Sequence, residues 1–150
     1  MKHFLLPDVQ AKPGVPLDHL TWAGRYVAEK QPDVIICIGD FADMESLSSY
    51  DVGKKSFEGR SYKADLDAAH TAMQLFLSPI RELQQQQRRN KERIYKPRFI
   101  LTLGNHEQRI PRAINSDRKL DGLISVKDLP YGNWEVYPYL EPVVINGVCY

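Results

Sequence analysis

The sequence predicts an α/β fold in which helices flank a central, mainly parallel sheet. Short apolar segments, which are typical of buried strands, alternate with longer segments that repeat apolar residues every three or four positions, as helices do. The order strand, helix, strand, helix, strand is that of a parallel sheet with crossover helices. At 150 residues the chain has the size of one domain, and no linker divides it.

The first half of the chain supplies two strands and one helix of this pattern. Segment 4–6 is apolar and is followed by Pro7, which predicts a short buried strand ending in a loop. A helix with small and apolar residues on one face is expected to open at Pro16 and to stop before Pro32. The continuous β-branched segment 34–38 predicts a second strand that is covered on both faces.

The second half begins with a long polar segment, 44–63, which has no clear periodicity. A loop of this length in a compact domain is usually functional or mobile. A helix is expected to begin near Asp65, and Pro79 is expected to kink it or divide it in two. Segment 99–103 predicts a third strand, after which Asn105 is a candidate N-cap for a short helix.

The last seventeen residues have strand character in three short segments, 134–136, 143–145 and 148–150. Asn146-Gly147, between the last two, is a strong signal for a two-residue hairpin turn because both positions accept a positive φ. The end of the chain is therefore expected to form a β-hairpin.

Composition leaves the partner largely open. The formal net charge is +1, and no segment is apolar for long enough to span a membrane, so the chain is expected to be soluble. Cys37 and Cys149 lie in apolar segments, without a CxxC pair or a secretory leader, which favours buried, reduced thiols in a cytoplasmic protein. The histidines His19 and His70 are expected to be structural or exposed.

A basic run lies between the second predicted helix and the third predicted strand. Its members are Arg88, Arg89, Lys91, Arg93, Lys96 and Arg98. Such a run is most often a solvated helix end or loop. The alternative is a surface for a phosphate-rich partner such as a nucleic acid.

Each of the three predicted strands is followed by a residue with an oxygen ligand. The three blocks are Asp8-Val9-Gln10, Gly39-Asp40-Phe41-Ala42-Asp43 and Gly104-Asn105-His106-Glu107. Because the carboxyl ends of neighbouring parallel strands open on one crevice, we expect these blocks to meet there. Any one of them alone is more often a turn or a helix cap. Three in succession predict a metal site.

The chemistry of these donors suits divalent cations. Carboxylate and amide oxygens are hard ligands that fit Mn²⁺ or Mg²⁺, and an imidazole would add affinity for Zn²⁺ and Fe. One carboxylate that bridges two ions can hold them roughly 3.5–4 Å apart, the spacing used for in-line attack on phosphorus.

The three blocks resemble the calcineurin-like metallophosphoesterase family, whose pattern is D-x-H, then G-D-x-x-D, then G-N-H-E/D. The resemblance covers roughly residues 1–110 and is greatest to phage-encoded and nuclease-like members. It implies the first part of a layered α/β sandwich and a metal-dependent phosphoesterase, in particular a phosphodiesterase or DNA nuclease, that uses a hydroxide activated by two metals. Monoesters, nucleotides and phosphoproteins remain open as substrates.

The resemblance also implies roles for individual residues. Asp8 would bind the first metal, Asp40 would bridge both metals and Asn105 would bind the second. His106 would lie beside the scissile phosphate as a transition-state stabiliser or general acid. Asp43 would orient the imidazole of His106, because a carboxylate partner fixes the tautomer and favours the protonated ring.

The sequence departs from the family pattern at two places. Gln10 stands where the family has histidine. In one alternative its amide oxygen is a weak metal ligand, which favours Mn²⁺ over Mg²⁺, Fe, Zn²⁺ or Ni²⁺. In the other it does not bind the metal and instead hydrogen-bonds to a residue that does. The two later histidine motifs are absent, since the remaining histidines are His3, His19 and His70. This suggests a metallophosphoesterase domain truncated at its C-terminus. The alternative is a catalytically incomplete remnant that binds nucleic acid or a protein partner.

The long loop supplies the candidate substrate-binding residues Lys54, Lys55 and Arg60, which follow Asp43 closely enough to overhang the metals. The simpler interpretation is a mobile polar loop. Lys54-Lys55 lacks the upstream glycine of a P-loop, and no dinucleotide-binding G-x-G-x-x-G is present. Oligomeric state cannot be read from the sequence.

Overall fold

The computed structural model describes residues 1–50, 53, 55 and 58–150. Within them, four parallel strands form one sheet in the order β1-β2-β3-β4. The strands are β1 (His3–Leu6), β2 (Val34–Cys37), β3 (Arg98–Thr102) and β4 (Glu135–Tyr137). The predicted α/β class is confirmed, and β4 adds a fourth parallel strand at the edge beside β3.

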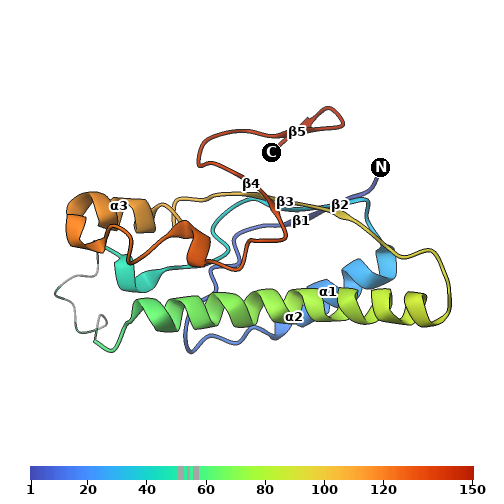
Figure 1. The fold of residues 1–150 in the computed structure, drawn as a ribbon, viewed down its shortest axis with the longest axis horizontal. Coiled ribbons are helices and arrows are strands. Elements are labelled where there is room, and N and C mark those ends of the chain that lie inside the picture. Colours follow the sequence, from blue (N-terminus) through green and yellow to red (C-terminus); the bar gives the residue numbers. More distant parts are fainter. Residues whose placement is uncertain (51–52, 54, 56–57) are drawn as a thin grey trace.

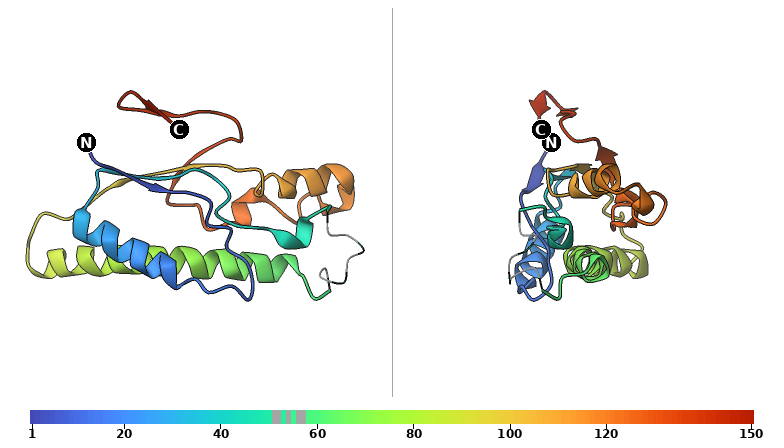
Figure 2. Two further views of the ribbon diagram at one scale, coloured as in Figure 1. Left: turned by 180° about the vertical axis from the view of Figure 1, so that it is seen from behind. Right: turned by 90° about the vertical axis from the view of Figure 1, so that its left-hand side faces the viewer.

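Two long helices cover one face of this sheet, as the views in Figures 1 and 2 show. They are α1 (Asp18–Lys30) and α2 (Tyr62–Arg89). A shorter helix, α3 (Arg109–Ser116), lies beyond the carboxyl ends of the strands, near the 3₁₀ turn η1 (Glu45–Leu47) (Figure 1). Two more 3₁₀ turns, η3 (Arg118–Leu120) and η4 (Val126–Asp128), lead toward β4.

The main core lies between the helices and the sheet. Alternate residues of the strands face it, including Ile35 and Cys37 of β2 and Leu101 of β3, all fully buried. Phe76 of α2 packs beneath them, with its ring 6.4 Å from that of Trp134. The period of two along each strand therefore decides which side chains meet the helices.

The opposite face of the sheet is covered by the hairpin of β5 (Val144–Ile145) and β6 (Val148–Cys149) (Figure 1). Val34, Ile36 and Ile100 form a second, smaller core with Val143 and Ile145 of this segment. The predicted hairpin is thus confirmed, and so is the prediction that β2 is buried on both faces. Its turn uses positive φ at Asn146 (49°) and Gly147 (82°).

Two expectations were wrong, and a third was wrong in part. Pro79 does not divide α2, which continues from Tyr62 to Arg89, because its contacts with α1 outweigh the one backbone hydrogen bond that a proline removes. Asn105 does not cap α3; residues 105–108 form turns and the helix begins at Arg109. Cys149 is exposed rather than buried, since its register partner is the exposed Val144 and the pair faces away from the sheet.

Cys37 is buried as predicted, and burial raises the pKa of its thiol to about 12. The basic run extends from the end of α2 through the loop before β3, and its side chains are exposed, as expected for a solvated helix end and loop. Arg98 pairs with Glu135 on β4 (2.6 Å). Among the described residues, no helix combines the length and the apolar character needed to cross a membrane.

Candidate functional site

The loops that follow β1 and β2 run side by side. The Gln10 N–H donates to the carbonyl of Asp40 and the Ala11 N–H to that of Phe41, both at 2.8 Å, and Ala11 forms a parallel bridge with Ala42. The parallel pairing of the two strands therefore continues into the loops. It brings the first predicted block next to the second.

Three of the predicted site residues have a left-handed backbone conformation. The φ angles are 47° at Asp8, 47° at Gln10 and 50° at Asp40. For a residue with a side chain this conformation costs about 1–2 kcal/mol and persists only where surrounding contacts hold it. Aspartate tolerates it better than most residues, but three instances within two adjacent loops are typical of a functional site.

Side chains of the first block contact each other. The Gln10 amide donates from Nε2 to Oδ1 of Asp8 at 2.6 Å. Asp8 is exposed and Gln10 is half-buried, so the pair lies at the surface of the crevice rather than in the core. This contact orients the Asp8 carboxylate through the amide of Gln10.

The third block wraps around Asp40. The backbone N–H of His106 donates to Oδ1 of Asp40 at 2.8 Å. Gly104 lies so close to Asp40 that a Cβ at this position would collide with its backbone nitrogen and its carboxylate, which explains the glycine. Asn105, between these two residues, is exposed at the same edge. The predicted meeting of the blocks is thus observed for Asp40 and the Gly104–His106 turn.

His106 lies against Asp43, as its predicted role requires. Nδ1 of the imidazole is 2.9 Å from Oδ1 of Asp43 and 2.9 Å from its carbonyl oxygen. Asp43 is only 5% exposed, and it also receives Nζ of Lys12 (3.0 Å) and a guanidinium N–H of Arg109 (2.9 Å). Three cationic or ionisable side chains therefore converge on one carboxylate. The catalytic role of His106 itself stays a prediction.

This environment determines the ionisation of Asp43. Burial would raise the pKa of the carboxyl, but the hydrogen bond and charge of Lys12, with the charges of His106 and Arg109, hold that pKa below its ordinary value of 3.8. Asp43 is therefore ionised at neutral pH and remains available as an acceptor for the imidazole. Lys12 and Arg109 carried no signal in the sequence, because only the fold brings them to Asp43.

Glu107 belongs to the third block, but the sequence pattern did not indicate its role in joining this block to the second. Its carboxylate is fully buried and accepts hydrogen bonds from five donors. They are the backbone N–H groups of Asp40 (3.0 Å), Phe41 (2.9 Å), Ala42 (3.2 Å) and Gly104 (2.9 Å) and the hydroxyl of Tyr131 (2.8 Å). Five donors and no acceptor suit an ionised carboxylate. Glu107 thus joins the second block to the third.

A partial signal for Glu107 was present. It follows Gly104 by three residues, a spacing at which a carboxylate can turn back to a backbone N–H. The bonds to the loop after β2 span 65 to 67 residues, however, and cannot be inferred from local spacing. Tyr131 is buried beside Glu107, and its burial raises the pKa of the phenol well above its ordinary value.

The oxygen atoms of the predicted ligands are of the kind that binds a hard divalent cation. Among the residues that the structure describes, no group of three or more His, Cys, Asp and Glu side chains is placed to share a metal. The predicted ligands include two carboxylates, Asp8 and Asp40; Gln10 and Asn105 would contribute amide oxygens. Oxygen donors of this kind suit Mg²⁺, Mn²⁺ or Ca²⁺ more than Zn²⁺.

Two of the three predicted substrate-binding residues, Lys55 and Arg60, are described by the structure, whereas Lys54 lies outside the described residues. Lys55 is exposed, and Arg60 is half-buried with its guanidinium 3.7 Å from the carboxylate of Glu45. Their role in binding substrate stays a prediction. His19 and His70 are exposed, as expected, with Nε2 of His70 3.1 Å from the carbonyl oxygen of Asp128.

Fold and site together define an α/β protein with a carboxylate- and histidine-bearing site beyond the carboxyl ends of a parallel sheet. Comparison of the chain with protein-family models, curated proteins and solved structures found no significant match.

Proposed function

We propose that the protein is a metal-dependent phosphoesterase that acts on phosphodiesters. The observation that carries this proposal is the arrangement of Asp40, His106 and Asp43. The backbone of His106 is bound to the Asp40 carboxylate while its imidazole is bound to Asp43. The turn that carries His106 thus joins an oriented imidazole to an oxygen ligand from the loop after β2, an arrangement suited to hydrolysis of a phosphate ester.

Asp8, Asp40 and Asn105 are the residues that would hold divalent cations, with Gln10 either ligating or fixing Asp8. When bound, such cations neutralise phosphate charge and lower the pKa of water. Mn²⁺ is the ion proposed first, with Mg²⁺, Fe, Zn²⁺ and Ni²⁺ as alternatives, because amide and carboxylate oxygens dominate the set.

The tautomer of His106 follows from its contacts. Both groups that face Nδ1, the carboxylate and the carbonyl of Asp43, are acceptors, so Nδ1 carries a proton. Nε2 is then the nitrogen that gains or loses a proton during the reaction. In the proposed mechanism it protonates the leaving oxygen of the ester, and Asp43 stabilises the charged ring before the transfer.

Hydrolysis of bis-p-nitrophenyl phosphate with added Mn²⁺ tests the proposal. We expect His106→Gln to lower kcat by at least about a hundredfold, the usual contribution of a general acid. Asn105→Ala should raise the Mn²⁺ concentration needed for half-maximal rate. Arg118→Ala, at an exposed position outside the site, is the control. Equal rates in all four proteins would remove these residues from the mechanism.

One observation favours a second candidate, a non-catalytic domain that binds nucleic acid or a protein. Within the described part of the chain, the site offers two carboxylates but no three-residue group of the usual metal-binding side chains. Titration calorimetry with Mn²⁺ separates the two functions. Binding that Asp40→Asn abolishes supports the enzyme, whereas no Mn²⁺ binding to the wild type supports the second candidate.

A further inference from the structure

A cleft of mixed polar and apolar lining adjoins the candidate site on the side of α3. It has a volume of about 550 Å³ and lies between α3 and the segment that contains η1 and residues 48–50. This volume is within the range of small-ligand pockets, about 300–1,000 Å³, and is sufficient for a nucleotide. The polar lining residues used in the argument are Ser46, Ser48, Ser49, Tyr50, Arg109 and Arg112.

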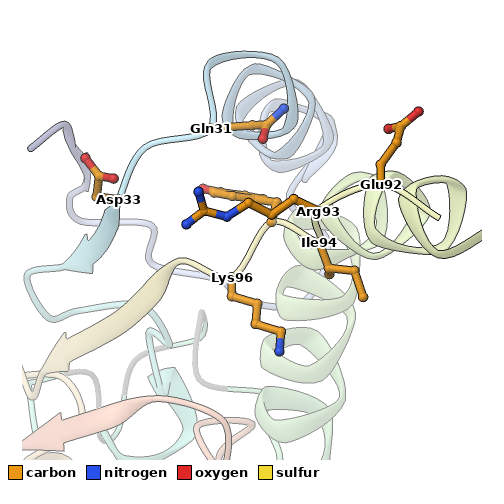
Figure 3. A pocket seen from close by; sticks show the side chains of 7 residues that line it. Gln31, Asp33, Glu92, Arg93, Ile94 and Lys96 are labelled. Atoms are coloured by element: carbon orange, nitrogen blue, oxygen red, sulfur yellow. The ribbon is translucent and has the colours of Figure 1, made fainter. Parts of the chain in front are cut away.

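The charge of the cleft lining is entirely positive. Arg109 and Arg112 are three residues apart on α3 and so lie on one face of the helix. No Asp or Glu is among the described residues that line the cleft. Figure 3 shows a contrasting cavity of about 640 Å³ near the C-terminus of α1, where Asp33 and Glu92 accompany Arg93 and Lys96. Of these two cavities, the cleft beside the site is therefore the one suited to an anion.

The two arginines have different functions. Arg109 is held by Asp43, which is also the partner of His106, so the wall of the cleft and the imidazole share one carboxylate. Arg112 is exposed, and its guanidinium has no hydrogen-bond or ion-pair partner in the described part of the chain. Arg109 therefore fixes the position of the cleft relative to His106, while Arg112 is free to bind a phosphate.

An aromatic ring lies at the same cleft. Tyr50 lines it and is 86% exposed, without a ring partner among the described side chains. An exposed tyrosine and a free arginine that line one cleft are suited to binding single-stranded nucleic acid, because an unpaired base can stack on the ring while the guanidinium binds the backbone. The serine hydroxyls of the lining can accept or donate to sugar and phosphate oxygens.

We propose that this cleft binds the nucleotide next to the scissile phosphodiester of a single-stranded nucleic acid, Arg112 contacting the flanking phosphate and Tyr50 stacking on the base. This proposal rests on the proposed phosphodiesterase function, because it assumes that a phosphodiester is cleaved at the neighbouring site. The substrate class of the site is then an oligonucleotide rather than a small phosphate ester or a phosphoprotein.

Fluorescence anisotropy with a fluorescein-labelled thymidylate dodecamer in EDTA tests the proposal, since binding is then measured without metal or turnover. We expect Arg112→Ala to weaken binding about tenfold and to lower the salt dependence by about one counterion. Tyr50→Ala should weaken it at least about fivefold, and Tyr50→Phe, which keeps the ring, should not. The matched control is Arg118→Ala, which removes the same charge outside the cleft.

Several results would overturn the proposal. Equal weakening by Arg112→Ala and Arg118→Ala would reduce the effect to net charge, and an unchanged affinity of Tyr50→Ala would remove the base contact. Polyphosphate or duplex DNA that competes as well as the single strand would have the same consequence, as would no binding at all. Cleft-dependent binding without hydrolysis of any diester would instead overturn only the proposed function.

Discussion

Glu107 is the residue on which the geometry of the site depends most. Its four backbone partners belong to two loops, the one after β2 and the one after β3, and no cation accompanies it among its described partners. A buried carboxylate of this kind is stable only while its donors remain in place. The loop that carries Asp40 and the turn that carries His106 are therefore positioned by the same side chain.

At the residue scale we predict that Glu107→Gln destabilises the protein by roughly 2–4 kcal/mol, because an amide replaces one acceptor by a donor that faces backbone N–H groups. The free energy of unfolding, measured with urea, checks this. Glu141→Gln, at an exposed position, is the control and should lie within about 0.5 kcal/mol of the wild type. Equal stability of the two variants would show that the network around Glu107 contributes little.

At the scale of elements, the packing of α1 on α2 depends on one small residue. A Cβ at Gly24 would collide with the carbonyl oxygen of Phe76 and would lie 3.2 Å from Cδ of Pro79. Gly24 is itself buried, and the two helix backbones approach each other closely at this point. The glycine therefore serves packing rather than backbone flexibility.

We predict that Gly24→Ala lowers the stability by about 1–3 kcal/mol, the cost of overpacking. The sign is the informative part, since Gly→Ala within an exposed helix raises stability by about 0.5–1 kcal/mol. Thermal unfolding monitored by circular dichroism provides the measurement, and Arg25→Ala, at the exposed neighbouring position, provides the control. A higher Tm for Gly24→Ala would contradict the close approach of the helices.

Across the whole molecule, the two faces of the sheet are covered unequally. Two long helices pack on one face, whereas the other is covered by a two-stranded hairpin (Figure 2). The buried contacts of this hairpin segment come from Val143 and Ile145, and Tyr150 packs beside them. A two-stranded hairpin is at best marginally stable alone, so its order depends on this small core. Local unfolding should therefore begin there.

Hydrogen exchange measured by NMR tests this expectation. The amides of Val143 and Tyr150, which bond to each other's carbonyl oxygens, should exchange by local opening, and those of β2 only by global unfolding. Ile145→Ala should accelerate exchange throughout the hairpin, while Val148→Ala, at a side chain that is 46% exposed, should change it little. Protection of the hairpin equal to that of β2 would contradict the prediction.

Local sequence patterns were enough to predict the α/β class, the positions of the first three strands, the hairpin turn and the three polar blocks that follow the strands. These are local properties: the period of apolar residues, the position of proline and glycine, and the register of a strand end are all read within a few residues. The contact between Asp43 and His106 was also predicted, but from the resemblance of the motifs.

The contacts that position those blocks relative to one another could be seen only in the tertiary structure. Lys12, Arg109 and Glu107 reach their partners across large separations in sequence, and the contacts that keep α2 intact through Pro79 come from other elements. The exposure of Cys149 depends in the same way on which face of the hairpin packs on the sheet. The physical reason is common to all of them: burial and long-range hydrogen bonds depend on which segments pack together, and local sequence does not record that choice.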